Sequence, residues 1–388
     1  MSTIVRVAAR GDGVTADGRH AAFAAPGDTL TDTGEVVPGP HHQVPPCRHF
    51  PECGGCQLQH LDDESYAGFV ADRVATALDA QGLSATIRPA LLSPPRARRR
   101  ATLHYDRGLL GFTANASHAI VDMRECHILH PALFALVAPL RALLQRLRPR
   151  RRADVHLTLT DQGADVLLGG VAAEGLAAAE ALTVFAQTHC LARLSIDDGF
   201  GPETRWEPQP VTVTLGGTPV LFPPAGFLQA TAEGEAALVA AVREATAGAG
   251  AVADLFAGLG TFALALPGRV YAAEGARDAL LALKAAAARA GRPVFAEHRD
   301  LFRRPLTTAE LDRFDAIVLD PPRAGAREQA AQLAASRAGR LAYVSCNPSS
   351  FARDAKVLCE GGWRLDWVQP VGQFRWSTHV ELAARFSR

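Results

Sequence analysis

A cysteine at the end of an apolar run near the C-terminus is the first candidate for chemistry. Leu341–Val344 predicts a buried parallel strand, and Cys346 follows it in the sequence Val-Ser-Cys-Asn-Pro. In an open α/β sheet the ligand site lies at the carboxyl ends of the strands. A free cysteine is more often a small buried hydrophobe. Cys346 therefore gains a function only if other groups at the same sheet edge support it.

A carboxylate follows the preceding strand of the same pattern. Asp320 comes directly after Ala316–Leu319 and opens the sequence Asp-Pro-Pro-Arg. Two prolines make a stiff, extended turn that holds the acidic side chain over the crevice. Methyltransferases acting on flat bases often present such a turn. An aromatic residue at the next position would favour transfer to an exocyclic amine, whereas Arg323 favours transfer to a ring carbon.

Methylation of a ring carbon needs both a thiol and a base. Carbon C5 of uracil is a poor nucleophile, but thiolate addition at C6 creates an enolate whose C5 can accept a methyl group. A base must then remove the C5 proton before the thiol is eliminated. The candidates are Cys346 and Glu381, although Glu381 alone could be a solvated carboxylate at a strand start. Because an ordinary cysteine is mostly protonated at neutral pH, we expect the site to lower the pKa of Cys346.

A glycine-containing turn after the first strand of this region predicts the cofactor. The sequence Asp-Leu-Phe-Ala-Gly-Leu-Gly begins at Asp254, and Glu274 ends the next strand. Glycines there let the backbone approach a ligand beside a helix N-terminus. Two glycines instead of three favour S-adenosylmethionine (SAM) over a dinucleotide, and the Glu274 carboxylate could accept hydrogen bonds from ribose hydroxyls. An ordinary glycine-rich turn is the alternative.

A second set of cysteines has the spacing of a metal site. The chain has seven cysteines, and an odd number without an export signal argues against disulfides. Four thiolates suit a structural zinc ion or an iron–sulfur cluster. The spacing of five and then two residues, with a distant fourth cysteine, favours a 4Fe–4S cluster. The four candidate ligands are Cys47, Cys53, Cys56 and Cys126.

Three regions must position these groups. Short β-segments fill residues 1–45, and residues 46–215 mix a helix, expected at Glu64–Ala80, with alternating strands. Residues 216–388 alternate strands and helices, which predicts a doubly wound, Rossmann-like α/β domain. Its expected strands are Ala251–Phe256, Arg269–Ala273, Pro293–Ala296, Ala316–Leu319, Leu341–Ser345, Trp363–Val368 and His379–Ala384, and its clearest helix is Arg277–Ala290.

Composition points to a soluble RNA-binding protein. The net charge is zero, but residues 88–152 hold thirteen arginines and only three acidic residues. A focused basic region fits a polyanion partner. No apolar run reaches about 20 residues and no signal peptide is evident, so we expect a cytoplasmic protein without a membrane span.

Together, these motifs resemble the RNA uridine-C5 methyltransferases, specifically the cluster-bearing branch that modifies 23S rRNA. The similarity covers nearly the whole chain, and Asp-Pro-Pro-Arg, Ser-Cys-Asn-Pro and His-Val-Glu in this order are specific to the family. The resemblance implies that Cys346 is the nucleophile, that Glu381 is the proton-abstracting base, and that the four cysteines bind a 4Fe–4S cluster. It also implies a class I SAM-dependent methyltransferase domain and an RNA partner. The cofactor-binding residues would be Gln229, Phe256, Thr261, Glu274, Asp300 and Asp320.

The sequence departs from this family at several places, and other functions stay open. Thr261 is often asparagine in the family, Ala285–Ala288 replaces common asparagines, and the N-terminal segment is similar to a shortened TRAM domain. The alternatives are a tRNA uridine-C5 methyltransferase, a cytosine-C5 RNA methyltransferase and a non-catalytic iron–sulfur RNA-binding protein. The tRNA-modifying branch typically lacks the cluster cysteines, and the cytosine enzymes carry a cysteine where this chain has Arg323. We expect a monomer that methylates 23S rRNA.

Overall fold

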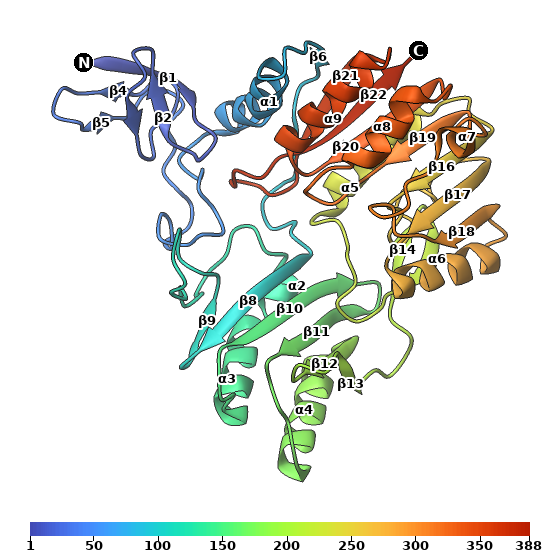
Figure 1. The fold of residues 1–388 in the computed structure, drawn as a ribbon. Helices are drawn as coiled ribbons and strands as arrows, with labels where there is room; N and C mark the ends of the chain where they lie inside the picture. The colour runs from blue at the N-terminus through green and yellow to red at the C-terminus, as the bar shows by residue number, and fades with distance from the viewer.

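The computed structural model describes residues 1–388, and its largest sheet has nine strands (Figure 1). Strands β16 to β20 are parallel, whereas β22 is antiparallel to both its neighbours, β20 and β21. The order is β18-β17-β16-β19-β20-β22-β21-β6, with β7 also pairing with β21. The bounds are β16 Ala251–Leu255, β17 Arg269–Glu274, β18 Val294–His298, β19 Ala316–Leu319, β20 Arg340–Ser345, β21 Arg364–Gly372 and β22 Glu381–Ser387.

Helices cover both faces of this sheet, which explains its apolar strands. Helices α5 (Ala232–Ala245) and α6 (Arg277–Arg289) contribute to the core on one face, and α1, α8 and α9 contribute to the core on the other. The latter helices span Asp63–Asp79, Arg327–Ala335 and Pro348–Glu360, and the short α7 spans Thr308–Leu311. All four residues of β19 are buried. The predicted doubly wound α/β domain is therefore confirmed.

Residues far upstream complete this sheet. Helix α1 packs on α9 and β21, and β6 (Thr86–Ile87) and β7 (Leu91–Leu92) pair in parallel with β21. The helix expected at Glu64–Ala80 is confirmed, shifted by one residue. The segment 46–215 therefore contributes to two different sheets, because its first part packs on the C-terminal domain.

The remainder of that segment forms a six-stranded sheet in the order β13-β12-β11-β10-β8-β9. Helices α3 (Val137–Leu147) and α4 (Leu176–Thr188) bury its apolar face. Along β8, Arg100, Thr102 and His104 alternate with buried residues and face the opposite side. The strands are β8 Arg100–Asp106, β9 Leu109–Gly111, β10 Ala153–Thr160, β11 Gly163–Gly169, β12 Arg193–Asp197 and β13 Glu203–Trp206; helix α2 is Pro131–Phe134, and β14 Thr212–Leu215 and β15 Thr218–Leu221 form a separate hairpin.

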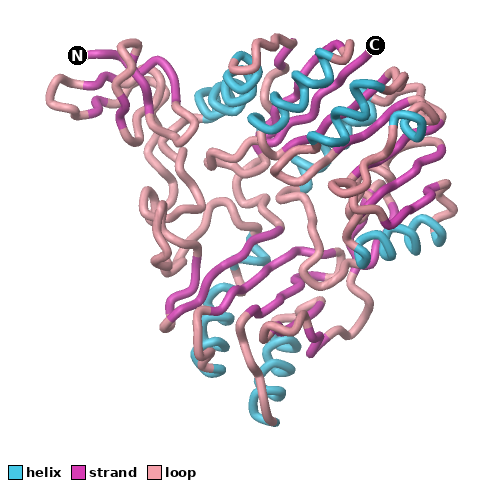
Figure 2. Tube along the Cα trace, viewed as in Figure 1, coloured by secondary structure: helices cyan, strands magenta, loops and turns pink.

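The N-terminal residues form a small antiparallel sheet in the order β3-β2-β1-β4-β5. Its strands are β1 Ser2–Val7, β2 Gly13–Thr15, β3 His20–Ala21, β4 Thr29–Leu30 and β5 Val36–Val37. Figure 2 shows a long loop between this sheet and α1, and three of the candidate cluster cysteines lie on that loop. No helix of the structure is both long and apolar enough to cross a membrane.

Candidate active site

A large open cavity of about 2630 Å³ lies at the carboxyl ends of the parallel strands. Residues of the six-stranded sheet, among them Arg100 and His104, line its opposite wall. The cavity lining brings together seven of the eight residues expected to act in catalysis or cofactor binding: Gln229, Phe256, Thr261, Glu274, Asp320, Cys346 and Glu381.

The candidate nucleophile and base meet because β22 inserts between β20 and β21. In the antiparallel ladder of β20 and β22, the last pair joins Ser345 to Leu382. Cys346 and Glu381 are the next residues on the two strands, so they occupy opposing positions just beyond the ladder. Cys346 is half-buried and Glu381 is buried. Helix α9 starts directly afterwards, where the Asn347 side chain caps the Ser349 N–H and Pro348 occupies the first turn.

The expectation of a lowered pKa for Cys346 is wrong. Burial raises its pKa to about 11, and the nearby carboxyl groups of Glu381 and Asp320 add to this, while Arg323 opposes it. A thiol loses water on burial, and negative neighbours disfavour a second negative charge. Arg323 of the Asp-Pro-Pro-Arg sequence is a nearby cation, but burial and the two acidic groups outweigh it. The Cys346 thiol is therefore protonated at neutral pH.

Burial also shifts the carboxyl groups at this sheet edge. The pKa of Glu381 is raised to about 7 by burial, against a hydrogen bond from Gln373 that lowers it. The pKa of Asp320 is raised well above its usual range by burial and by Glu381, Asp254 and Glu274. A carboxylate whose pKa lies near neutrality is suited to act as a general base at physiological pH. The arrangement can therefore supply a thiol on one strand and a base on its neighbour.

The turn after β16 is held by the carboxylate that ends β17. Glu274 accepts hydrogen bonds from the N–H of Gly258 at 2.8 Å and from the N–H of Ala276 at 2.6 Å. Gly260 has φ +93°, and a Cβ there would lie 2.4 Å from Leu283 Cδ1 of α6. Only glycine fits this approach of the turn to the helix. The Glu274 carboxylate thus fixes the turn in addition to bordering the cavity.

Asp300 is the candidate that does not line the cavity. Its carboxylate accepts hydrogen bonds from the N–H groups of Phe302 and Arg303, at 3.0 and 3.3 Å, and its side chain is 49% exposed. Two residues further along the chain, the Phe302 ring packs on Phe256, which lines the cavity, with 5.3 Å between centroids. In this structure Asp300 caps a turn at the cavity rim.

The sequence motifs gave no role to two buried residues of the site, Gln373 and Asp254. Gln373, 2% exposed, donates from Nε2 to Gln229 Oε1 at 2.9 Å. It stands in an irregular loop and has no motif that would mark it. Asp254 is fully buried, and neither of its carboxylate oxygens has a hydrogen-bond partner. Burial raises the pKa of Asp254 to about 7, so this carboxyl group is only partly ionised at neutral pH.

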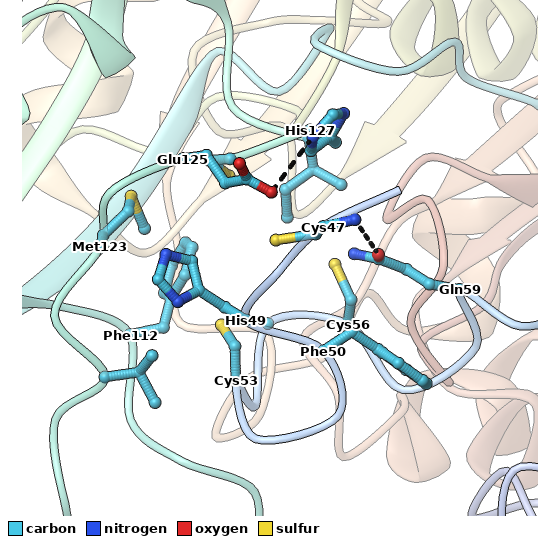
Figure 3. A pocket seen from close by; sticks show the side chains of 14 residues that line it. Cys47, His49, Phe50, Cys53, Cys56, Gln59, Phe112, Met123, Glu125 and His127 are labelled. Atoms are coloured by element: carbon cyan, nitrogen blue, oxygen red, sulfur yellow. Dashed lines mark hydrogen bonds and ion pairs between the residues drawn. The ribbon is translucent and has the colours of Figure 1, made fainter. Parts of the chain in front are cut away.

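The four cysteines with metal-like spacing line a separate, small cavity. In Figure 3 the sulfur atoms of Cys47, Cys53 and Cys56 face the same space. No three His, Cys, Asp or Glu side chains are close enough to hold one metal ion. A zinc site requires all its sulfurs about 2.3 Å from the ion, whereas a cluster is wider and binds its thiolates further apart. The structure thus brings four thiols around one largely apolar cavity.

The cluster cavity and the catalytic cavity are neighbours. Gly54, Gly55 and Phe112 belong to the cysteine loop or its surroundings and also line the catalytic cavity. Trp376, from the loop between β21 and β22, packs in one cluster with Cys56 and Ile128. Its carbonyl accepts hydrogen bonds from the N–H groups of Gln57 and Leu58. The cysteine loop thus supports the segment that leads to Glu381.

Comparisons with known proteins agree with this architecture. The fold is that of the class I SAM-dependent methyltransferases. A Pyrococcus abyssi tRNA (uracil-54, C5)-methyltransferase in complex with S-adenosyl-L-homocysteine aligns over 100% of both chains, with a TM-score of 0.76 and 21% identity.

Sequence comparison defines the family more closely. Residues 292–388 match the family model described as tRNA (Uracil-5-)-methyltransferase. An uncharacterized RNA methyltransferase of Zymomonas mobilis is 54% identical over 100% of both chains. A 23S rRNA (uracil(1939)-C(5))-methyltransferase of Chromohalobacter salexigens is 34% identical, over 91% of this chain and 78% of the relative. This chain belongs to the SAM-dependent RNA (uracil-C5)-methyltransferase family, as its motifs predict.

Proposed function

We propose that the protein methylates C5 of a uridine in 23S rRNA through a covalent bond between Cys346 and C6 of the base. The observation that carries this proposal is the opposition of Cys346 and Glu381 beyond the β20–β22 ladder, in the cavity that the cofactor turn also borders. The similarity to a named 23S rRNA enzyme supports the choice of RNA.

The roles of Cys346 and Glu381 follow from the chemistry of the uracil ring. The Cys346 thiol first releases its proton to solvent, and the thiolate sulfur adds to C6 of a uridine flipped from its stack, which moves electron density to C5 and O4. SAM, when bound, supplies an electrophilic methyl group to C5. Glu381 then takes the proton from C5, the C5–C6 double bond re-forms, and the Cys346–C6 bond breaks. Because Glu381 has a pKa of about 7, it can accept this proton and release it to solvent afterwards.

Binding of the cofactor would involve the residues around the first turn. Gln229, Phe256, Thr261 and Glu274 line the same cavity, and Asp320 would face the reacting groups from the end of β19. Asp300 would act from the rim, through the turn that it caps.

We also propose that Cys47, Cys53, Cys56 and Cys126 hold a 4Fe–4S cluster. The support is the shared cavity and its mostly apolar lining, which includes Phe50, Phe112 and Ile128. The cluster would connect the loop before α1 to the segment that carries Cys126. Its role would be to hold this wall of the catalytic cavity in place.

The proposed function is tested by methyl transfer from labelled SAM to separate RNAs. The protein, purified without oxygen, is incubated with 23S rRNA, 16S rRNA or tRNA transcripts, and the modified nucleoside is identified by mass spectrometry. We expect 5-methyluridine in 23S rRNA. 5-Methyluridine only in tRNA would replace the proposed substrate, and 5-methylcytidine would overturn the chemistry.

Two cysteine variants separate the mechanism from general damage. Cys346→Ala is expected to lose more than about 10³-fold in kcat while it still binds SAM. Cys359→Ala is the matched control, since Cys359 is also partly buried but lies at the far end of α9. Full activity of Cys346→Ala would refute the covalent mechanism.

A further inference from the structure

We propose that Gln373 is a positioning residue that links the cofactor-binding residue Gln229 to the base Glu381, so that both are oriented by one side-chain amide. The inference rests on the proposed function for the roles of these two partners. Gln373 directly follows β21 and is 2% exposed.

The orientation of the Gln373 amide follows from its hydrogen bonds. Its Oε1 accepts from the backbone N–H of Ala230 at 3.1 Å. A peptide N–H can only donate, so the oxygen must be on that side and the NH₂ group on the other. The NH₂ group donates to Gln229 Oε1 at 2.9 Å. The Gln373 amide is therefore fixed by a backbone group that no side-chain rotation can remove.

The same logic orients Gln229. Since its Oε1 accepts from Gln373, its own NH₂ group is the end left free. Gln229 lines the catalytic cavity. It therefore offers hydrogen-bond donors, not an acceptor, to a bound ligand. Without Gln373, the Gln229 amide could turn over and present the wrong end.

The Gln373 amide also influences Glu381, the residue proposed to remove the C5 proton. Gln373 lies two residues beyond Val371, which pairs with Glu381 in the β21–β22 ladder, and its amide opposes the rise of the Glu381 pKa caused by burial. A donor stabilises the charged carboxylate more than the neutral acid. The other titratable or charged groups around Glu381 are Asp320, Cys346, Arg323 and His379. Among the groups facing it, Gln373 is the uncharged donor that favours the ionised base.

Close packing against α5 holds Gln373 in this place. Gly234 lies in the first turn of α5, where Thr231 Oγ1 accepts from its N–H at 3.0 Å. A Cβ at Gly234 would lie 2.6 Å from Gln373 Cβ and 2.9 Å from its Oε1. Contacts this short force a shift. The absence of a side chain at Gly234 is thus what allows the Gln373 amide to reach both partners.

The test compares Gln373→Met with Gln369→Met in the full-length protein purified without oxygen. Methionine keeps the approximate volume but removes the amide. Gln369 is a matched control because it is also buried on β21, and its Nε2 donates only to the carbonyls of Pro89 and Pro370. The measurements are SAM affinity by calorimetry and the pH dependence of single-turnover methylation of 23S rRNA.

For Gln373→Met we expect about tenfold weaker SAM binding and a shift of the rising limb of the pH profile by about one unit to higher pH. Gln369→Met should change neither. A Gln373→Met protein with wild-type SAM affinity and an unshifted profile overturns the inference. A merely structural role would lower the melting temperature without moving the pH profile.

Two further outcomes keep the result interpretable. If Gln373→Met does not fold, Gly234→Ala tests the same geometry, since it moves Gln373 without changing its chemistry; an unshifted profile in that variant also overturns the inference. If the wild-type protein methylates no uridine, the proposed function has failed. If the wild-type protein methylates uridine and the Gln373 variants behave like it, only this inference has failed.

Discussion

Cys346 and Glu381 stand opposite each other one residue beyond the Ser345–Leu382 pair that ends the β20–β22 ladder. This relationship exists because the last strand of the chain runs antiparallel and inserts beside β20. A parallel strand there would place Glu381 at the other end of the sheet. The strand reversal thus brings a base to a thiol that lies 35 positions earlier in the sequence.

Replacing the base should trap the covalent intermediate. In Glu381→Ala, Cys346 can still add to C6, but the C5 proton is not removed, so the protein–RNA bond persists and turnover falls by about 10²- to 10⁴-fold. A denaturing gel with labelled RNA measures the trapped species. The double variant Cys346→Ala/Glu381→Ala must show no such band. If Glu381→Ala forms no adduct but remains inactive, Glu381 is not the base that resolves it.

The reactivity of the Cys346 thiol should depend on the charge of Glu381. Because burial and negative neighbours raise the pKa of Cys346 to about 11, its alkylation should accelerate up to high pH. Glu381→Gln removes one negative neighbour, so the alkylation profile should move to lower pH. Peptide mass spectrometry after timed iodoacetamide treatment follows Cys346 separately from the other cysteines. An unchanged profile would show that Glu381 does not influence the thiol.

The methylation rate itself should rise with pH. Glu381 is active as the carboxylate, and its pKa is about 7, so kcat/KM should increase as the pH passes through about 7. Thiolate formation at Cys346 adds a further rise towards the alkaline end. Steady-state methylation of RNA between pH 6 and pH 9 gives this profile. A rate that falls over this range would require a group that must be protonated.

The buried carboxyl group of Asp254 should make the protein less stable at higher pH. Its pKa is 3.8 in the unfolded chain and about 7 in the folded protein. Between these values the folded state keeps a proton that the unfolded state releases, so stability falls as the pH rises, by on the order of 2–4 kcal/mol in total. Above about pH 7 the contribution of the protonated Asp254 carboxyl group to the free energy of unfolding is fully lost.

Asp254→Asn provides the comparison, since an amide does not ionise. Glu381 and Asp320 titrate in a similar direction, and Asp254 adds to the raised pKa of Asp320, so the difference between the two proteins reports Asp254 together with its effect on Asp320. Denaturant unfolding at pH 4.5 to pH 8 should give a flatter dependence for the variant. Identical slopes for both proteins would mean that the Asp254 carboxyl group is hydrated or paired in solution.

The four clustered cysteines should bind iron and sulfide together. Protein purified without oxygen should contain iron and acid-labile sulfide in equal amounts, and Cys53→Ser should lose most of both. Cys190→Ser is the control, because Cys190 is exposed and far from the cavity in sequence and fold. Stoichiometric zinc without sulfide would replace the cluster with a single-ion site. Removal of the cluster should also lower the melting temperature, because bound metal adds to folding stability.

Sequence patterns predicted the elements that rely on local periodicity. The helix at Asp63–Asp79 and the buried strands β16, β19 and β20 follow apolar spacing that neighbouring residues determine. The residues lining the catalytic cavity could be found because their motifs follow strand ends. Asp300 belongs to such a motif, yet its side chain turns to the backbone of Phe302.

Properties that depend on convergence of distant segments were not predictable. The direction of the Cys346 pKa shift requires knowing that Asp320 and Glu381 both lie near the thiol and that the thiol itself is half-buried. Gln373 has no motif, and its partners at positions 229 and 230 are more than 140 residues away. The pairing of β6 and β7 with β21 spans nearly 300 residues, and two-residue strands have no periodicity to detect.

The position of β21 also has a consequence for synthesis on the ribosome. Helix α1, β6 and β7 leave the exit tunnel early but find their partner strand only when the last residues of the chain have been made. Until then the apolar face of α1, including Tyr66, Phe69 and Val70, is without its native cover. The six-stranded sheet between them contains all its own strands and can fold first. In a stalled chain that ends before β21, the six-stranded sheet would therefore be folded while the apolar face of α1 stays exposed. Such an exposed face is prone to aggregation, so we expect this chain to be bound by chaperones.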